Sequence, residues 1–178
     1  MPEHQGEQKE AQQEDTMRGR FITFAVDREM YGIEIRYVTE IVGIQPINRL
    51  PETPEHIKGI INLRGKIIPV VDMRLKFKRE PAAYNDRTCI IVIDIQDISA
   101  GLIVDEVAEV VAIKDEDISP PPKRGTGANS RYLCGIGKAG DAVKLLLDCE
   151  TLFNDSEEST FSSRTEGEME SCLPGLEI

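Results

Sequence analysis

Residues 59–72 read GIINLRGKIIPVVD, and this stretch decides the fold. Two apolar runs rich in Ile and Val flank the segment Asn62-Leu63-Arg64-Gly65. Ile and Val favour β-strands, and Gly65 can adopt the positive φ that a tight turn requires. The stretch therefore predicts a β-hairpin with its turn at Arg64 and Gly65.

Similar short apolar runs recur on both sides of this hairpin, from Phe21 to Phe153. They are four to seven residues long, and Gly, Pro, Asp or Asn bounds them, as is typical of many short strands. Helical periodicity is scarce, although Asp72 and Asp148 precede short segments for which they can act as N-caps. We predict a mostly β fold, with barrels or sandwiches favoured over an open sheet.

An internal repeat organises these strands into two copies. Residues 135–148 match 59–72, since each segment begins Gly-Ile and ends in an apolar run closed by Asp, and residues 99–111 match 30–42. We therefore expect two similar halves, about 21–80 and 87–153. Each is small for an independent domain, so the two should pack together.

The repeat also isolates Arg64 as a candidate functional residue. The turn that matches Asn62-Leu63-Arg64-Gly65 in the second copy is Lys138-Ala139-Gly140-Asp141, so the hairpin can close without the arginine. One interpretation is that Arg64 recognises carboxylate or carbonyl groups of a partner. The other is a solvated turn residue or a local ion pair, and the residues alone leave the two about even.

Charge is unevenly distributed along the chain. The 178 residues carry a formal net charge of −11, and the Gln-rich and Glu-rich segment 1–20 and the acidic segment 154–178 hold most of it. We expect both segments to be disordered tails, because they have too few apolar residues to offset the entropy of ordering. An acidic chain is a poor nucleic-acid binder. The basic stripe between residues 64 and 79 is better explained by solubility or by contact with an acidic protein.

The sequence contains few residues in patterns suited to catalysis or cofactor binding. The four cysteines form no C-x-x-C, the two histidines are far apart, and the G-x-G-x-x-G at 135–140 runs into a strand pattern, so we interpret it as a hairpin turn. We predict no catalytic, cofactor-binding or metal-binding residue. The alternative function is a small-molecule-binding protein or a carboxylate-based enzyme with its site in a cleft between the barrels. With no apolar stretch long enough for a signal or membrane span, we expect a cytoplasmic protein.

Four segments together resemble the CheW-like family of chemotaxis coupling proteins. They are FITFAVDREMYGIEIRYVTEIVG (21–43), HIKGIINLRGKIIPVVDMRLKF (56–77), YNDRTCIIVIDI (84–95) and GLIVDEVAEVV (101–111). The resemblance covers about Arg20 to Phe153. It implies two five-stranded SH3-like β-barrels packed through a shared core, with a few short helices.

The resemblance also implies a function and a set of site residues. Family members are non-enzymatic adaptors that join the cytoplasmic hairpin tips of chemoreceptors to the regulatory domain of the histidine kinase CheA in signalling arrays. Membrane association is then only indirect, through the receptors. By position, the expected receptor-binding residues are Val38, Glu40, Arg64 and Ile90. Gly59 matches a position that affects partner binding, indirectly through the turn. The kinase-binding face stays unassigned.

Overall fold

The computed structural model describes residues 17–121 and 130–153, and most of these residues lie in strands. The predicted tails therefore lie outside the described residues, apart from Met17 to Arg20 at the end of the first. The helices are α2 (Met73–Lys76) and α3 (Cys149–Phe153), with the 3-10 turns η1 (Ile35–Tyr37), η2 (Asp115–Asp117) and η3 (Ser130–Tyr132). The strands are β1 (Arg20–Val26), β2 (Glu29–Glu34), β3 (Val38–Gly43), β4 (Ile57–Leu63), β5 (Lys66–Asp72), β6 (Cys89–Ile95), β7 (Ile98–Val104), β8 (Glu106–Ala112), β9 (Ile118–Ser119), β10 (Leu133–Ala139) and β11 (Ala142–Leu147).

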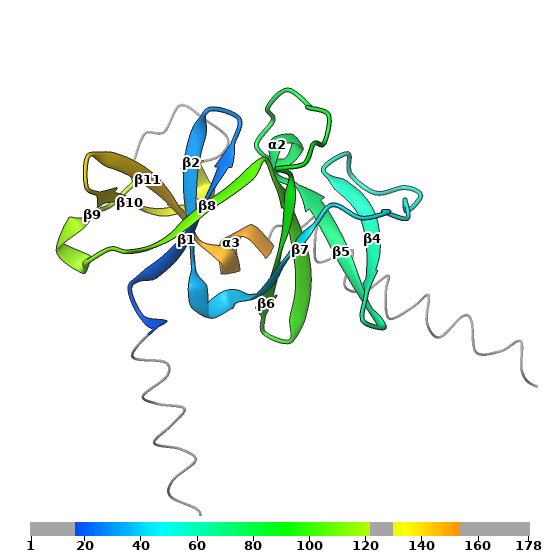
Figure 1. The fold of residues 1–178 in the computed structure, drawn as a ribbon, viewed down its shortest axis with the longest axis horizontal. Coiled ribbons are helices and arrows are strands. Elements are labelled where there is room, and N and C mark those ends of the chain that lie inside the picture. The colour runs from blue at the N-terminus through cyan, green and yellow to red at the C-terminus, as the bar shows by residue number, and fades with distance from the viewer. Residues whose placement is uncertain (1–16, 122–129, 154–178) are drawn as a thin grey trace, which may run out of the picture.

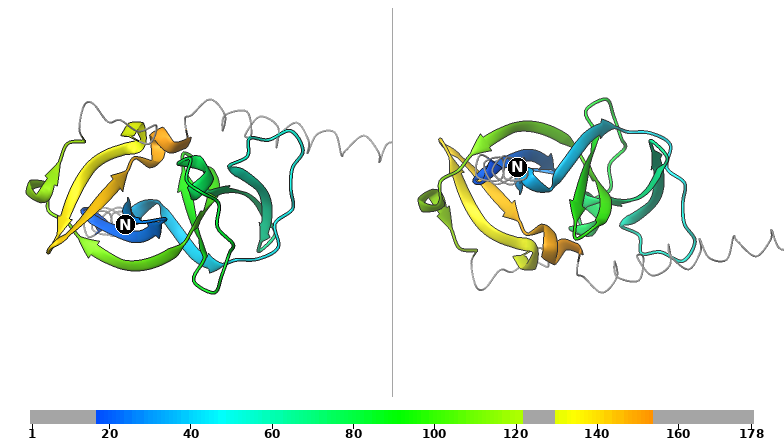
Figure 2. Two further views of the ribbon diagram at one scale, coloured as in Figure 1. Left: turned by 90° about the horizontal axis from the view of Figure 1, so that it is seen from above. Right: turned by 90° about the horizontal axis from the view of Figure 1, so that it is seen from below.

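The described strands form two sheets that pack side by side (Figures 1 and 2). Sheet A has the strand order β8-β1-β2-β11-β10-β9, and sheet B has the order β3-β6-β7-β5-β4. The mostly β fold with a few short helices is thus confirmed. Sheet A has six strands rather than the expected five, because the two-residue strand β9 pairs with β10.

The repeat is visible in the structure, but the two sequence halves exchange strands. Hairpins β4–β5 and β10–β11 are equivalent, and each is followed by a short helix. However, β1 and β2 pair with β8 and β11 in sheet A, while β6 and β7 join β3 and β5 in sheet B. The predicted halves 21–80 and 87–153 therefore do not coincide with the two sheets, because each half places its first hairpin in the sheet of the other half.

Both short helices begin as predicted, at an aspartate that closes a strand. The Asp72 side chain accepts hydrogen bonds from the backbone N–H groups of Arg74 and Leu75, and Asp148 accepts from Glu150 and Thr151. These bonds satisfy N–H groups that have no partner within the helix, so each Asp stops its strand and starts the next turn.

Three apolar clusters hold the two sheets. One lies within sheet B and contains Ile61, Ile68, Val70, Ile90, Val92 and Ile103. A smaller one lies within sheet A around Phe21, Ile113 and Leu146. The largest lies between the sheets and takes residues from both, among them Phe24, Tyr31, Ile91, Ile93 and Leu102. Alternate residues of β6 therefore enter two different clusters, so both faces of this strand are buried.

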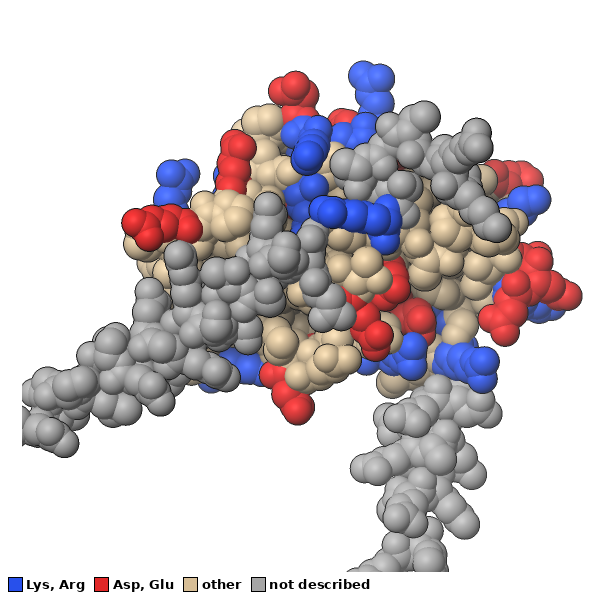
Figure 3. Space-filling model, turned by 180° about the vertical axis from the view of Figure 1, so that it is seen from behind, with Lys and Arg blue, Asp and Glu red and all other residues tan. Residues whose placement is uncertain are grey.

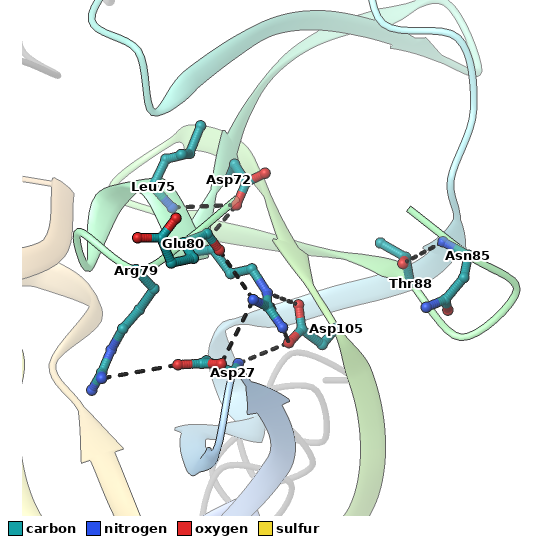
Figure 4. A network of polar contacts seen from close by, with 9 residues as sticks. Asp27, Asp72, Leu75, Arg79, Glu80, Asn85, Thr88 and Asp105 are labelled. Carbon is teal, nitrogen blue, oxygen red and sulfur yellow. Dashed lines mark hydrogen bonds and ion pairs between the residues drawn. The ribbon is translucent and has the colours of Figure 1, made fainter. Parts of the chain in front are cut away.

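A polar network joins the sheets where the chain crosses between them (Figure 4). Arg74, at the start of α2, donates through Nε and Nη2 to the Asp105 carboxylate at 2.7–3.0 Å, and Asp105 connects β7 to β8. Asp105 also accepts from the backbone N–H of Asp27 in the β1–β2 turn, at 2.7 Å. The hydrogen bond to Asp105 raises the pKa of the Arg74 guanidinium above its usual value. The ion pair between Arg74 and Asp105, together with the bond from Asp27, thus connects a turn of sheet A to the helix that follows β5 of sheet B.

We expect Asp105→Asn to lower the free energy of unfolding by about 1–3 kcal/mol, since it leaves a half-buried guanidinium with weaker acceptors. Chemical denaturation measures the change. The control is Lys114→Gln, because the Lys114–Glu116 pair spans 4.0 Å with both side chains more than three-quarters exposed. That change should cost less than about 0.5 kcal/mol. Equal losses in the two variants would contradict a special role for the Arg74–Asp105 pair.

Candidate functional site

The tip of the β4–β5 hairpin is a two-residue turn made by Arg64 and Gly65. Leu63 pairs with Lys66 across it, and both turn residues have positive φ, 55° and 84°. Two positive φ values in succession define a type I′ turn, which matches the twist of a hairpin. The side-chain oxygen of Asn62 accepts from the Gly65 N–H at 2.9 Å and fixes the turn further. The spacing Asn62-x-x-Gly65 is the sequence signal for this bond, which our sequence analysis did not use.

Arg64 therefore occupies a backbone position that favours glycine. In the equivalent hairpin, Ala139 pairs with Ala142 and the residue matching Arg64 is Gly140, whose φ is 64°. A side chain at such a φ costs roughly 1 kcal/mol or more, which glycine avoids. The side chain of Arg64 is 83% exposed, so packing does not offset this cost. The fold by itself does not account for an arginine at this turn.

Glu40 faces Arg64 from the opposite edge of sheet B. The Nη2 of Arg64 lies 3.4 Å from Oε2 of Glu40, whose side chain is 26% exposed. Because β3 and β4 are the two edge strands, this contact shows that the sheet curls until its edges approach. The expected local ion pair is thus present. In the second copy the matching residues are Glu109 and Gly140, so this ion pair belongs to the first copy only.

Val38 and Ile90 lie at different depths. Val38 is half-buried at the start of β3, pairs with Ile93 and packs against the cluster between the sheets. Ile90 is 0% exposed and points into the cluster within sheet B. A fully buried side chain has no surface to offer, so the role expected of Ile90 in receptor binding stays a prediction that has to act through the interior of sheet B. The structure brings Glu40 and Arg64 together and places Val38 on the same strand as Glu40.

Gly59 supports the loop that precedes its own strand. Its φ is +145°, and a Cβ at this position would lie 2.0 Å from the carbonyl oxygen of Asn48. Asn48 exchanges two backbone hydrogen bonds with Ile60, at 2.8 and 2.9 Å. The role expected for Gly59 was indirect and acted through the turn. The structure provides a different indirect route, through the β3–β4 loop.

The basic stripe of residues 64–79 does not form one surface. Arg74 is bound to Asp105, and Lys76 is only 7% exposed, whereas Arg64 and Lys66 are exposed at the hairpin tip. Sequence analysis also missed two apolar side chains near this tip, Ile41 and Ile67, which are 40% and 49% exposed. Their signal was present in the outward positions of the strand alternation.

The described residues offer little to a metal or a substrate. Residues 17–121 and 130–153 contain no group of three His, Cys, Asp or Glu side chains arranged to hold a metal ion. A cavity of about 100 Å³ lies beside α2, but its polar side chains bond to one another. Tyr84 donates to Asp72 at 2.8 Å, and burial together with this bond raises the pKa of its hydroxyl.

Two further expectations concern the G-x-G-x-x-G segment and the membrane. Residues 135–140 fall in β10 and its turn, and β11 follows rather than a helix, so the interpretation as a hairpin is confirmed. Among the helices of the described segments, none has the length and apolar character needed to cross a membrane.

Comparison with known proteins shows which family has this sequence and fold. A family model described as the CheW-like domain matches residues 20–157. The chain is 36% identical over 143 residues to a chemotaxis protein CheW of Klebsiella aerogenes, which covers 80% of this chain and 86% of that one. It is 32% identical over 142 residues to CheW of Treponema pallidum, covering 78% and 84%. The crystal structure of the scaffolding protein TtCheW from Thermoanaerobacter tengcongensis superposes with a TM-score of 0.72 and 38% identity, covering 78% and 94%.

These relatives and the exposed, charged hairpin define a non-enzymatic adaptor of chemotaxis. The chain belongs to the CheW-like domain family. The alternative of a small-molecule-binding protein or an enzyme finds no support in the comparisons.

We expect Arg64→Gly to keep or raise the free energy of unfolding, by up to about 1 kcal/mol, because glycine relieves the left-handed backbone. Arg64→Val removes the same charge but adds a β-branched side chain at that φ, and should cost about 1–3 kcal/mol. Denaturation of both variants separates backbone conformation from charge. The same stability in both would contradict the conformational argument.

Gly59→Ala should lower the free energy of unfolding by at least about 2 kcal/mol, because the new Cβ collides with the backbone of Asn48. Gly43→Ala in β3 is the matched control, since nothing lies within 4 Å of a Cβ there. Chemical denaturation compares the two. A loss for Gly59→Ala no larger than the loss for Gly43→Ala would show that the loop yields to the collision.

Proposed function

We propose that this chain acts in the cytoplasm and couples the cytoplasmic hairpin tips of chemoreceptors to the regulatory domain of the histidine kinase CheA. Membership of the CheW-like family supports the adaptor role. The observation that carries the receptor side of the proposal is Arg64, an exposed arginine held at a turn position where the equivalent hairpin has glycine.

The proposed receptor-binding surface consists of Val38, Glu40 and Arg64. Its chemistry suits a helical hairpin that presents both charge and apolar side chains. The guanidinium of Arg64 can bind a partner carboxylate through two parallel hydrogen bonds. Glu40 holds this guanidinium near β3, and the half-buried Val38 on the same strand supplies an apolar contact. Gly59 and Ile90 act behind this surface, by fixing the β3–β4 loop and the interior of sheet B.

The ion pair between Glu40 and Arg64 is weak enough to be exchanged for contacts with a partner. Its atoms are 3.4 Å apart and the arginine is largely exposed, so it contributes at most about 1 kcal/mol. A partner carboxylate that excludes water from the pair therefore gains more than the ion pair loses. Exposed edges of the two sheets remain the natural place for contacts with the regulatory domain of CheA.

The test is saturable binding to a receptor signalling fragment and to CheA, measured separately and by co-sedimentation of all three. Arg64→Gly should weaken receptor binding by about 1–3 kcal/mol, roughly 5-fold to 150-fold, and leave CheA binding unchanged. Lys138→Gly is the matched control, because it removes an exposed cation from the equivalent hairpin. It should leave the receptor affinity at the wild-type value.

Two outcomes would contradict parts of this proposal. If Arg64→Gly is native by circular dichroism and binds the receptor fragment as wild type does, Arg64 is not a receptor contact. If the wild-type protein binds neither partner saturably, the coupling function itself is wrong.

A further inference from the structure

A row of aromatic rings runs between the sheets and ends near the last helix. Tyr31 stacks on Phe77 with centroids 4.9 Å apart, and Phe77 lies 6.2 Å from Tyr132 in η3. Cations cluster at the Tyr132 end, where the Arg131 guanidinium lies 4.7 Å and the Lys76 ammonium 5.1 Å from the centroid of the ring. We call Lys78, Arg79 and Arg131, which are exposed or half-buried, the α2–η3 cationic surface. Lys76 is only 7% exposed and contributes its charge from the interior, against the Tyr132 ring. On the face shown in Figure 3, Lys and Arg side chains gather in the upper middle of the view.

Arg79 has incomplete acid pairing within this surface. Its Nη1 lies 4.0 Å from Oδ2 of Asp27, while Nη1 of Arg74 lies closer to the same carboxylate, 3.7 Å from Oδ1. Arg79 also donates a hydrogen bond to the Tyr31 hydroxyl. The Nε of Arg79 is buried and has no hydrogen-bond partner among the described residues. A guanidinium whose N–H groups lack close acceptors is stabilised by an additional anion nearby. Lys78 is exposed beside it, so the surface is open to an acidic segment.

The chain leaves α3 directly beside this surface. The backbone N–H of Asp148, just before α3, donates to the Tyr132 carbonyl at 2.8 Å, and α3 packs against η3. Leu152 is buried in the same apolar cluster as Phe77 and Tyr132, and Phe153 packs against that cluster. The next acids along the sequence are Asp155, Glu157 and Glu158. All three fall within five residues of Phe153, a span of at most about 17 Å of extended chain.

The charge of the segment complements the surface. Residues 154–178 contain seven acids and one base. A tether of a few residues gives these acids an effective concentration in the millimolar range, far above that of a free acidic peptide in most settings. An acidic segment of another protein would therefore have to displace residues 154–178 before it could bind the α2–η3 cationic surface.

We propose that residues 154–178 bind, through the acidic run Asp155–Glu158, to the α2–η3 cationic surface of the same chain. This contact competes with any acidic segment of a partner for that surface. It does not depend on receptor binding by Arg64, which lies at the tip of the β4–β5 hairpin. Because the attraction is between largely exposed charges, salt weakens it, and a partner with more acids can displace it.

A carbodiimide, which joins a carboxylate directly to a neighbouring amine, tests this on the full chain by peptide mass spectrometry. We expect the 155–158 carboxylates to be joined to Lys78 far more often than to Lys138, which is equally exposed on the distant β10–β11 hairpin. Raising the salt from 0.05 M to 0.5 M should lower the Lys78 yield about tenfold. Arg131→Gln should also lower it, by about threefold, while Arg20→Gln at the start of β1 should not.

Neither variant changes a reacting group, and thermal unfolding of Arg131→Gln checks that the fold is retained. Equal yields at Lys78 and Lys138, or equal effects of Arg131→Gln and Arg20→Gln, would overturn the proposal. Mixing ¹⁵N-labelled and unlabelled chains distinguishes binding within one chain from binding between chains. Products that join labelled to unlabelled peptides would overturn binding within the same chain and assign the surface to a second copy.

Discussion

Tyr31 and Phe77 face each other with their ring centroids 4.9 Å apart, Tyr31 from β2 of sheet A and Phe77 from the end of α2, which follows β5 of sheet B. The apolar cluster around this contact is the constraint on which both sheets depend. Neither sheet has a large interior of its own, as the three buried residues of the cluster within sheet A show. Of the three clusters, the one between the sheets contains the most buried residues, so the stability of each sheet depends on the face that the other sheet covers.

Much of the local structure could be predicted from the sequence. The hairpin at 59–72, its second copy and the two Asp caps each depend on neighbouring residues, and all of them are present. The exchange of strands between halves could not be predicted, because strand neighbours are chosen by contacts distant in sequence. The sequence of Cys89–Ile95 also does not indicate which of its side chains face which side of the sheet. Since both its faces are buried, it lacks the alternation that distinguishes one face from the other, and the burial of Ile90 could not be predicted for that reason.

In the candidate site, too, one residue could be identified from neighbouring sequence and its partner only from the three-dimensional structure. Comparison of the two turns was enough to single out Arg64, because the repeat supplies a second hairpin that closes with Gly140. Its partner Glu40 could not be assigned from the repeat, since Glu109 occupies the matching position and suggests a shared structural role. Only the curling of sheet B, which brings β3 to the β4–β5 turn, distinguishes the two glutamates. At the first position of the turn, one hairpin thus has an exposed arginine and the other has glycine.

The exchange of hairpins also determines the order in which the protein can be completed during translation. Sheet B contains only strands up to β7, so all of its members are available once residue 104 has left the ribosome. Sheet A begins with β1 and β2 but closes its centre with β11, where Leu145 pairs with Tyr31. In the first hairpin to be synthesised, β1 gains its partner β8 once residue 112 is made, whereas β2 gains its partner β11 only when nearly the whole folded region has emerged. Sheet B thus offers β1 and β2 an apolar face to pack against before sheet A is complete.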